Sequence, residues 1–463
     1  MVFPTLEFLL FFAVVLVLNL LCDGRPATRK AMLIGASYFF YGVWDVRFLA
    51  LMGGVTVVAW VGGLFVTRPG LRRPVLILSI GLLLGTLGIF KYANFFILSL
   101  SGLLSSIGLA RDMTWAGVIL PVGISFYVFQ AISYVVDVAR GDIAHRKNPA
   151  DVALYISFFP QLVAGPIVRA ADFLPQIDAP QPPTAAIRAE AVVLILIGLF
   201  KKMVVANYLG VLLVDPTFAF PAEQDALTAW VALLAYAFQI FCDFSGYSDI
   251  AIGIALLLGY RFQRNFNQPY RAASLREFWQ RWHISLSSFI RDYLYIPLGG
   301  NRGGAGRVAV VLIVTMTLAG LWHGAAWPFV MWGFLHGAGL AVERLFRARG
   351  LRLVRPVATL LTFAFVVLLW LPFRAGSTDV ALQMLTTMTG GSLATSAPIA
   401  LPVWVLLVIG FAMNHLPLSL RSRSIDAIAN LPAIGQAATL ALGVLLNFAL
   451  SQEGTAPFIY FQF

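Results

Sequence analysis

Charged residues are scarce in this sequence. They make up 11% of the 463 residues, whereas about a quarter of the residues in an ordinary soluble domain are charged. Hydrophobic residues make up 60% instead. This balance excludes an ordinary soluble protein and predicts an all-α, polytopic membrane protein built from apolar helices with short connections.

Cysteines and metal-binding spacings are also rare. The two cysteines, Cys22 and Cys242, lie beside or inside apolar runs, and no Cys-x-x-Cys or His-x-x-x-His spacing occurs. We therefore expect neither a disulfide nor a bound metal. Ser245 lacks the Gly-x-Ser-x-Gly frame of a hydrolase nucleophile, so we do not expect it to act as one.

The net charge of +11 comes mostly from arginines in short loops between apolar runs. This distribution argues against nucleic acid as a partner and marks those loops as cytoplasmic. The charge rule then places both termini on the outer side of the membrane, with about twelve crossings. The expected spans cover 8–21, 31–49, 50–67, 75–98, 117–139, 190–213, 229–258, a hairpin over 308–342, 356–373, 401–419 and 431–450.

Two segments are too short or too polar for full crossings. Residues 151–168 are apolar but interrupted by prolines and a glycine, which predicts a re-entrant or half-length helix. Residues 286–298 are amphipathic and are expected to dip into the bilayer. No repeat or shift in composition marks a boundary, so we expect a single membrane domain over 1–463.

His323 lies inside the apolar run 308–342. A full charge at membrane depth costs roughly 2.5–3.5 kcal/mol, but histidine can enter neutral. Gly320, Gly324 and Pro328 flank it and weaken a continuous helix. The pattern predicts a neutral imidazole at a helix break that faces a polar pocket. A histidine that only bonds a neighbouring helix is the alternative.

Two further clusters carry polar side chains into apolar surroundings. His283 lies among aromatic residues next to the amphipathic segment, whereas His336, beside Gly333 and Gly337, fits a structural packing position. Asp243 and Asp249 lie within the expected span 229–258. Such carboxylates usually have partners or line a polar path, and a proton-coupled transporter would also use them.

The loop 260–307 holds eight arginines beside a glycine-rich stretch at 299–304. Membrane topology alone explains a few of them, and a phosphate-bearing ligand would explain the surplus. Both interpretations stay open. The aromatic C-terminus, 457–463, is typical of an interfacial anchor.

Three stretches, 242–253, 278–307 and 320–337, resemble the membrane-bound O-acyltransferase family. They are most similar to its bacterial branch, which includes the alginate O-acetyltransferase membrane subunit and related D-alanyl and peptidoglycan acyl-transfer proteins. Residues 121–137 and 158–169 extend the resemblance over nearly the whole chain. It implies a multi-helix core in which funnels from both sides meet at a histidine that matches His323, with His283 at the family's second position.

The resemblance also implies a function: an acetyl or other short acyl group passes from cytosolic acetyl-CoA, a co-substrate and not a bound cofactor, across the bacterial inner membrane. A periplasmic partner protein then O-acetylates a polysaccharide. In this branch a C-terminal motif, here 458–463 with Tyr460 central, relays the acyl group. The alternative is a transporter or flippase of an acyl donor or glycan precursor. The supporting or pore-lining residues expected are Asp243, Ser245, Tyr247, Asp249, Trp279, Trp282 and Trp322, and the donor-binding arginines expected are Arg281, Arg291 and Arg302.

Overall fold

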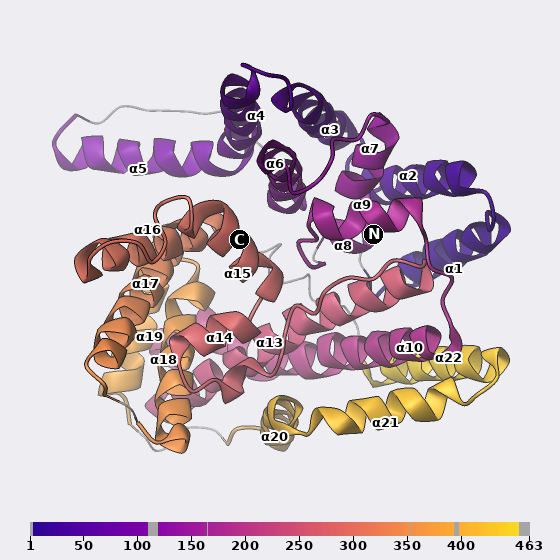
Figure 1. The fold of residues 1–463 in the computed structure, drawn as a ribbon. Coiled ribbons are helices and arrows are strands. Elements are labelled where there is room, and N and C mark those ends of the chain that lie inside the picture. Colours follow the sequence, from indigo (N-terminus) through magenta and orange to yellow (C-terminus); the bar gives the residue numbers. More distant parts are fainter. Residues whose placement is uncertain (1–2, 110–118, 164, 352, 393–397, 453–463) are drawn as a thin grey trace. The chain divides into compact units, whose positions relative to one another are not determined.

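The computed structural model describes residues 3–109, 119–163, 165–351, 353–392 and 398–452, and their regular structure is helical (Figure 1). The all-α prediction is confirmed. The chain divides into two compact units, which we describe separately. Unit 1 comprises residues 1–183 and 254–262, and unit 2 comprises residues 184–253 and 263–463. The single domain over 1–463 stays a prediction.

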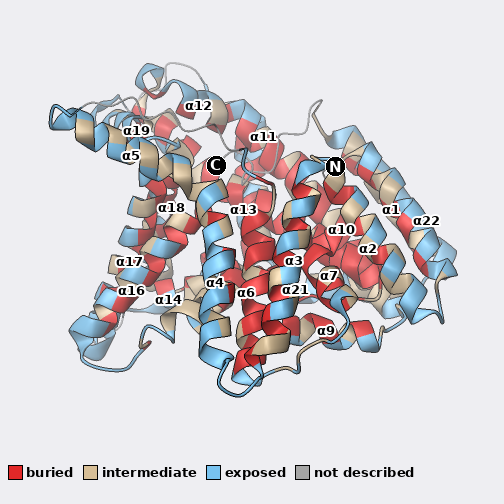
Figure 2. Ribbon diagram, turned by 90° about the horizontal axis from the view of Figure 1, so that it is seen from above, coloured by how far each residue is buried: buried red, intermediate tan, exposed pale blue. Residues whose placement is uncertain are grey.

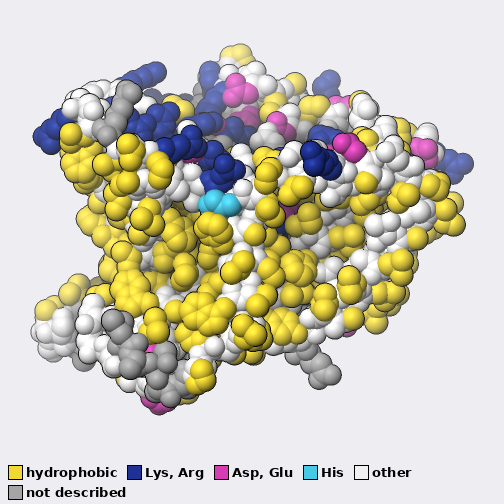
Figure 3. Space-filling model, turned by 90° about the horizontal axis from the view of Figure 1, so that it is seen from below, with side chains coloured by type: hydrophobic (Ala, Val, Ile, Leu, Met, Phe, Trp, Pro, Cys, Tyr) yellow, Lys and Arg dark blue, Asp and Glu magenta, His cyan; other side chains and the backbone are white. Residues whose placement is uncertain are grey.

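Six helical stretches within the described residues are long and apolar enough to cross a membrane. A bent pair of helices adds a seventh if it is one broken span. Hydrophobic side chains also make up much of the surface drawn in Figure 3, as lipid contact requires. The multi-spanning prediction is therefore confirmed, and the number of about twelve crossings stays a prediction. The six are Arg47–Val66, Arg72–Ser106, Ala226–Leu257, Ala305–His323, Arg355–Ala375 and Ala433–Leu450.

Unit 1 is built around α3, α4 and α6, which pack on one another, with α7 against α2 and α3. A π-helical segment, Gly88–Tyr92, joins α4 to α5. The helices are α1 (Leu6–Leu21), α2 (Pro26–Gly42), α3 (Arg47–Val66), α4 (Arg72–Leu87), α5 (Ala93–Ser106), α6 (Ile124–Arg140), α7 (Pro149–Ser157), α8 (Phe159–Leu162) and α9 (Ala170–Asp178).

Two expectations for unit 1 meet different outcomes. The short-helix prediction for 151–168 is confirmed, because this segment forms the short, buried helices α7 and α8. The boundary expected between 49 and 50 is wrong, since the break lies between Gly42 and Arg47. There the Asp45 carboxylate accepts a hydrogen bond from the Arg47 backbone N–H at 2.9 Å and sets the start of α3. Continuous hydrophobicity on both sides hides this polar break.

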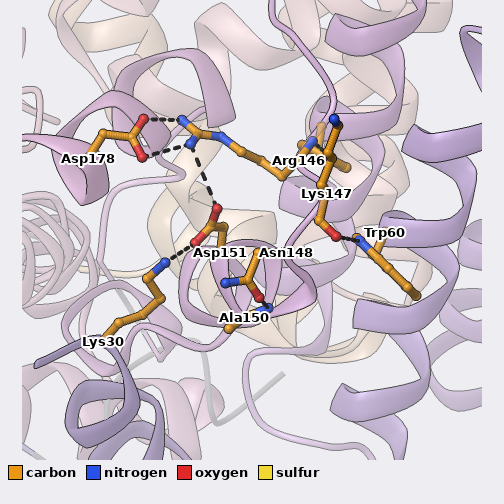
Figure 4. A network of polar contacts seen from close by, with 9 residues as sticks. Lys30, Trp60, Arg146, Lys147, Asn148, Ala150, Asp151 and Asp178 are labelled. Atoms are coloured by element: carbon orange, nitrogen blue, oxygen red, sulfur yellow. Dashed lines mark hydrogen bonds and ion pairs between the residues drawn. The ribbon is translucent and has the colours of Figure 1, made fainter. Parts of the chain in front are cut away.

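A network of ion pairs ties three segments of unit 1 together (Figure 4). The Asp151 carboxylate at the start of α7 pairs with Lys30 on α2 and lies 3.7 Å from an Arg146 nitrogen. Arg146 also binds Asp178, the last residue of α9, at 2.7 Å. Asn148 caps α7 by accepting the Ala150 N–H. These charges fix the ends of helices that are too short to be positioned by spanning the bilayer.

Unit 2 contains most of α13, which is buried along most of its length (Figure 2). Residues 185–219 form a helical path with two π-helical segments, Phe200–Ala206 and Gly210–Val214. The helices are α10 (Ala185–Leu199), α11 (Asn207–Leu209), α12 (Asp215–Ala219), α13 (Ala226–Leu257, whose last residues fall in unit 1), α14 (Leu275–Arg281), α15 (Ile284–Ile290), α16 (Ala305–His323), α17 (Trp327–Ala348), α18 (Arg355–Ala375), α19 (Thr378–Gly390), α20 (Leu401–His415), α21 (Leu418–Ala429) and α22 (Ala433–Leu450).

The predicted hairpin over 308–342 is confirmed as α16 and α17, which lie side by side (Figure 1). Glycines bring the two backbones into contact. A Cβ added at Gly333 would overlap the carbonyl oxygen of Met316, and one added at Gly337 would lie 2.6 Å from the Cα of Ile313. Only a residue without a side chain fits these positions, as the small-residue pattern predicts.

The expected span 401–419 is wrong at its end. Helix α20 stops at His415, and α21 continues after a bend of 86°. Leu416 adopts ψ 143°, the extended conformation that a following proline, Pro417, imposes. The amphipathic segment expected over 286–298 begins slightly earlier, as α15, and continues through a π-helical segment to Tyr295.

Candidate active site

His323 is the last residue of α16, and the break that follows it has a local cause. Gly324 is extended at φ −155°, and α17 then begins at Trp327 with Pro328 in its first turn. A side chain at Gly324 would overlap the ring of Phe329. His323 is 4% exposed, so its imidazole is buried at the predicted helix break. The polar pocket that it was expected to face stays a prediction.

His283 lies between α14 and α15 and is fully buried. Its ring centroid is 6.3 Å from that of His323 and 4.5 Å from that of Phe244 on α13. Neither ring nitrogen has a hydrogen-bond partner among the described residues. Its backbone is left-handed, with φ +43° and ψ 55°. The structure therefore brings the two predicted histidines together, although they lie forty residues apart in the sequence.

Aromatic rings enclose this pair of histidines. Trp322, Trp332 and Phe373 have centroids 5.0, 5.1 and 5.3 Å from that of His323. Trp322 also lies 6.1 Å from His283. Water-poor surroundings strengthen any electrostatic or proton-transfer interaction made inside them. Trp322, which the sequence predicts to support the site, thus lies beside both imidazoles.

A second aromatic layer lies next to the first. Trp282 packs on Trp370 at 5.0 Å, and Trp370 packs on Trp332 at 5.9 Å. Trp279 lies 5.7 Å from Trp332 and 5.1 Å from His336. His336 is fully buried among these rings, at the structural position expected of it.

Asp243 and Asp249 on α13 both form ion pairs with neighbouring lysines. The Lys202 ammonium contacts Asp243, and both side chains are almost completely buried. The Lys201 ammonium lies 2.7 Å from Asp249, and that pair is partly exposed, at 13% and 17%. Both lysines lie in the π-helical segment Phe200–Ala206. Sequence reasoning missed these lysines, although two charges inside the expected span 190–213 were a visible signal.

Ser245 and Tyr247 are buried on the same stretch of α13 as Asp243. The Ser245 hydroxyl has no hydrogen-bond partner within the described part of the chain. The Lys202 ammonium lies 5.6 Å from the centre of the Tyr247 ring. Ser245 and Tyr247 thus lie one and three positions after Phe244, whose ring packs against that of His283.

A basic cavity of about 430 Å³ opens beside the histidines. Ile284, the residue after His283, and Trp279 are among its lining residues, and Trp332 packs against both Trp279 and His323. Guanidinium groups that surround such a space suit a ligand that carries phosphate. The lining residues are Arg276, Trp279, Gln280, Ile284, Ser287, Ser288, Arg291, Tyr295, Asn301, Leu312, Leu340, Glu343, Arg344 and Arg347.

The three arginines expected to bind the donor have different positions. Arg291 lines the cavity and pairs with Asp292 at 2.6 Å. Arg281 does not line it; it pairs with Glu277 at 2.8 Å and belongs to a neighbouring cavity. Arg302 lines neither cavity. Sequence reasoning missed Arg344 and Arg347, because they are distant in the chain and only the packing of α17 brings them to the cavity.

Tyr460 and the motif 458–463 lie outside the described residues. Among the described residues, no group of three or more histidine, cysteine or carboxylate side chains could hold a metal ion.

Comparison with known proteins decides the family. The model of the membrane-bound O-acyltransferase family matches residues 141–371. The probable alginate O-acetylase AlgI of Pseudomonas putida is 40% identical over an alignment that covers all of both chains. The chain belongs to the membrane-bound O-acyltransferase family. The resemblance seen in the sequence is confirmed, and the protein is a multi-pass membrane enzyme.

Two further relatives of this O-acyltransferase extend the comparison. The probable alginate O-acetylase AlgI of Azotobacter vinelandii is 42% identical over 84% of this chain and 78% of its own length. The peptidoglycan O-acetyltransferase of Helicobacter pylori is 34% identical over 95% of this chain and 92% of its own. The family match spans both histidines, both aspartates and every residue that lines the cavity.

Proposed function

We propose that this O-acyltransferase moves an acetyl group from cytosolic acetyl-CoA across the bacterial inner membrane to a periplasmic partner protein, which O-acetylates an exported or cell-surface polysaccharide. The observation that carries the proposal is the pair of buried imidazoles, 6.3 Å apart, beside a basic cavity. The names of the relatives, alginate O-acetylase and peptidoglycan O-acetyltransferase, support acetyl as the group and a polysaccharide as the final acceptor.

The donor binds in the basic cavity. Arg276, Arg291, Arg344 and Arg347 hold the phosphates of CoA, and the thioester arm points toward Ile284 and the histidines. Trp332 packs against both Trp279, which lines the cavity, and His323, so the thioester passes close to its ring. This set of arginines replaces the set expected from the sequence, of which it keeps Arg291.

His323 acts as the general base. It takes the proton of an acceptor hydroxyl while that oxygen attacks the thioester carbonyl, the C–S bond breaks, and the proton passes to the departing thiolate to give CoA thiol. For a phenol, proton transfer to imidazole in water is uphill by roughly 5 kcal/mol, so the transfer accompanies attack and does not precede it. His283, on the other side of the site, orients the acyl group or its carbonyl.

The acceptor of this step is the Tyr460 phenol. The acetylated tail then delivers the group to the periplasmic partner. The charge rule supports this route, because about twelve crossings from a periplasmic N-terminus also leave the C-terminus in the periplasm.

The transporter alternative would use Asp243 and Asp249 as a proton path. Each of these carboxylates is ion-paired with a lysine, which is a structural arrangement of charges. Family membership also favours an O-acyltransferase. The alternative predicts that the protein neither binds acetyl-CoA nor becomes acetylated.

Labelled acetyl-CoA and purified protein test the proposal. We expect mass spectrometry to find a covalent acetyl group on Tyr460 in the wild type and none in His323→Ala, which should still fold and bind its partner. His415→Ala is a matched control, because this histidine is more exposed than His323 and its ring stacks on Phe411, four residues earlier on the same helix. Acetylation of the polymer at a tenth of the normal level or more in His323→Ala would refute the base assignment. An absence of labelling in the wild type, with and without the partner, would favour the transporter.

A further inference from the structure

The backbone around His283 is held in an uncommon conformation. Among the described residues, two that are not glycine have positive φ, namely Gln268 at 48° and His283 at 43°. Both lie in the polar segment between α13 and α15. Side chains disfavour this left-handed region, and such residues persist only where the surrounding structure fixes them. Contacts with neighbouring residues must therefore hold the His283 backbone in this conformation.

Asn265 restrains the backbone on the C-terminal side of His283, at Ile284 and Ser285. Its Oδ1 accepts hydrogen bonds from the Ser285 N–H at 3.2 Å and from the Ser285 hydroxyl at 2.9 Å. Its Nδ2 donates to the Ser248 hydroxyl on α13 at 3.1 Å. Its backbone carbonyl accepts the Ile284 N–H at 2.9 Å. Asn265 is 1% exposed, so these bonds form away from competing water.

The same segment also fixes the chain before His283. The Asn267 N–H donates to the Arg281 carbonyl oxygen at 2.9 Å. Residues 265–267 thus hold His283 from both sides, and the Ser248 contact ties them to α13, which also carries Phe244 against the imidazole. The imidazole has no hydrogen bond of its own among the described residues. Its position therefore depends on this backbone and on ring packing.

We propose that Asn265 is a positioning residue for His283: its side chain links α13 to the start of α15 and so sets the placement of the imidazole relative to His323. This inference rests on the proposed function, in which His283 orients the acetyl group. Asn265 itself touches neither imidazole and takes no part in the transfer. A displacement of about 1 Å in a reacting group can cost roughly 100-fold in rate.

A double-mutant cycle tests the proposal. The readout is the single-turnover rate of covalent labelling by radiolabelled acetyl-CoA, measured over a range of acetyl-CoA concentrations with full-length protein in detergent. We expect Asn265→Ala to lower the maximal rate about 10- to 100-fold. The half-saturating concentration should stay nearly constant, because Asn265 does not line the donor cavity. His283→Ala should be slower still, and the double variant no slower than His283→Ala.

Two comparisons separate positioning from general damage. Asn265→Asp keeps an oxygen that accepts the Ser285 bonds and can accept from the Ser248 hydroxyl, so it should recover most of the rate. Asn414→Ala removes another fully buried asparagine of unit 2, whose hydrogen bond among the described residues goes to the Gly410 carbonyl oxygen of α20, and should keep the wild-type rate. Imidazole NMR signals of ¹³C-histidine-labelled protein give a readout independent of turnover. The His283 signal should move in Asn265→Ala and stay in place in Asn265→Asp.

Several results would overturn the proposal. Losses that multiply in the double variant would show that Asn265 acts independently of His283, and a wild-type rate in His283→Ala would show the same. An unmoved His283 signal in a folded Asn265→Ala protein would contradict it directly. Failure of the proposed function would look different, since the wild type would then show no labelling, or His323→Ala would label at the wild-type rate, while the NMR comparison still reports on Asn265.

Discussion

The buried ion pair of Lys202 and Asp243 allows a prediction about the thermal stability of the protein. Lys202→Met keeps the apolar stem of the side chain but removes the ammonium group that contacts the Asp243 carboxylate. Both side chains are nearly inaccessible, at 2% and 5% exposure, so water cannot replace the lost charge. We therefore expect a large loss of stability from the removal of one partner.

The magnitude follows from burial. Removal of one member of a buried ion pair typically costs about 3–5 kcal/mol, whereas a pair that solvent reaches contributes about 0–1 kcal/mol. At about 2 °C per kcal/mol for a large unit, Lys202→Met should lower the melting temperature by about 6–10 °C. Lys201→Met is the matched control, because the neighbouring Lys201–Asp249 pair is partly exposed. This substitution should lower the melting temperature by about 2 °C or less.

The assay is thermal unfolding of the detergent-purified protein, followed by loss of the monodisperse peak in size-exclusion chromatography. The double variant Lys202→Met/Asp243→Leu should recover most of the loss, because replacement of both charges by apolar groups is often neutral. Equal shifts for Lys201→Met and Lys202→Met would refute the reasoning from burial. A double variant less stable than Lys202→Met would show that Asp243 is needed for more than its pairing with Lys202.

Two further predictions concern the donor cavity and the hairpin. Arg344→Ala should raise the half-saturating acetyl-CoA concentration in the labelling assay about 10- to 100-fold, the usual cost of a charged hydrogen bond. Arg302→Ala, outside the cavity, should leave that concentration unchanged, and equal effects would contradict the assignment of the cavity. Gly333→Ala should destabilise the protein by about 1–3 kcal/mol, because its Cβ meets the Met316 carbonyl. Gly306→Ala adds a methyl group in open space on the same hairpin and should leave the stability unchanged. A normal melting temperature for Gly333→Ala would show that the two helices separate freely.

Much of the fold follows from the sequence where apolar runs end in charge or in helix breakers. Charged loops bound the α16–α17 hairpin, and Gly324 and Pro328 place its bend at His323. The expected boundaries were wrong where apolar runs flank a short polar break on both sides, as at Asp45 between α2 and α3, or where one proline redirects the chain, as at Pro417. Hydropathy averages over many residues and does not detect a single cap or bend.

The site was predictable in its residues but not in their arrangement. His283 and His323 stand out as ionisable groups in apolar surroundings, and the structure brings their rings together. The partners of Asp243 and Asp249 and the role of Asn265 depend on contacts between distant segments. A single asparagine in a polar loop has no signature of its own in the sequence. The arginines that line the cavity follow the same rule, because only three-dimensional packing brings Arg344 to it and leaves Arg302 outside.

The glycine contacts between α16 and α17 have a consequence for how a group could cross the bilayer. Backbone atoms touch directly there, so the spacing of the two helices is set by covalent geometry and leaves little room for sliding. His323 ends one of these helices and is therefore a nearly fixed point at the bend of the hairpin. In the proposed function, an acetyl group exchanged at such a point would pass from one side to the other by the making and breaking of bonds. The protein then has no need to open alternately to the two sides, as a carrier of intact molecules must.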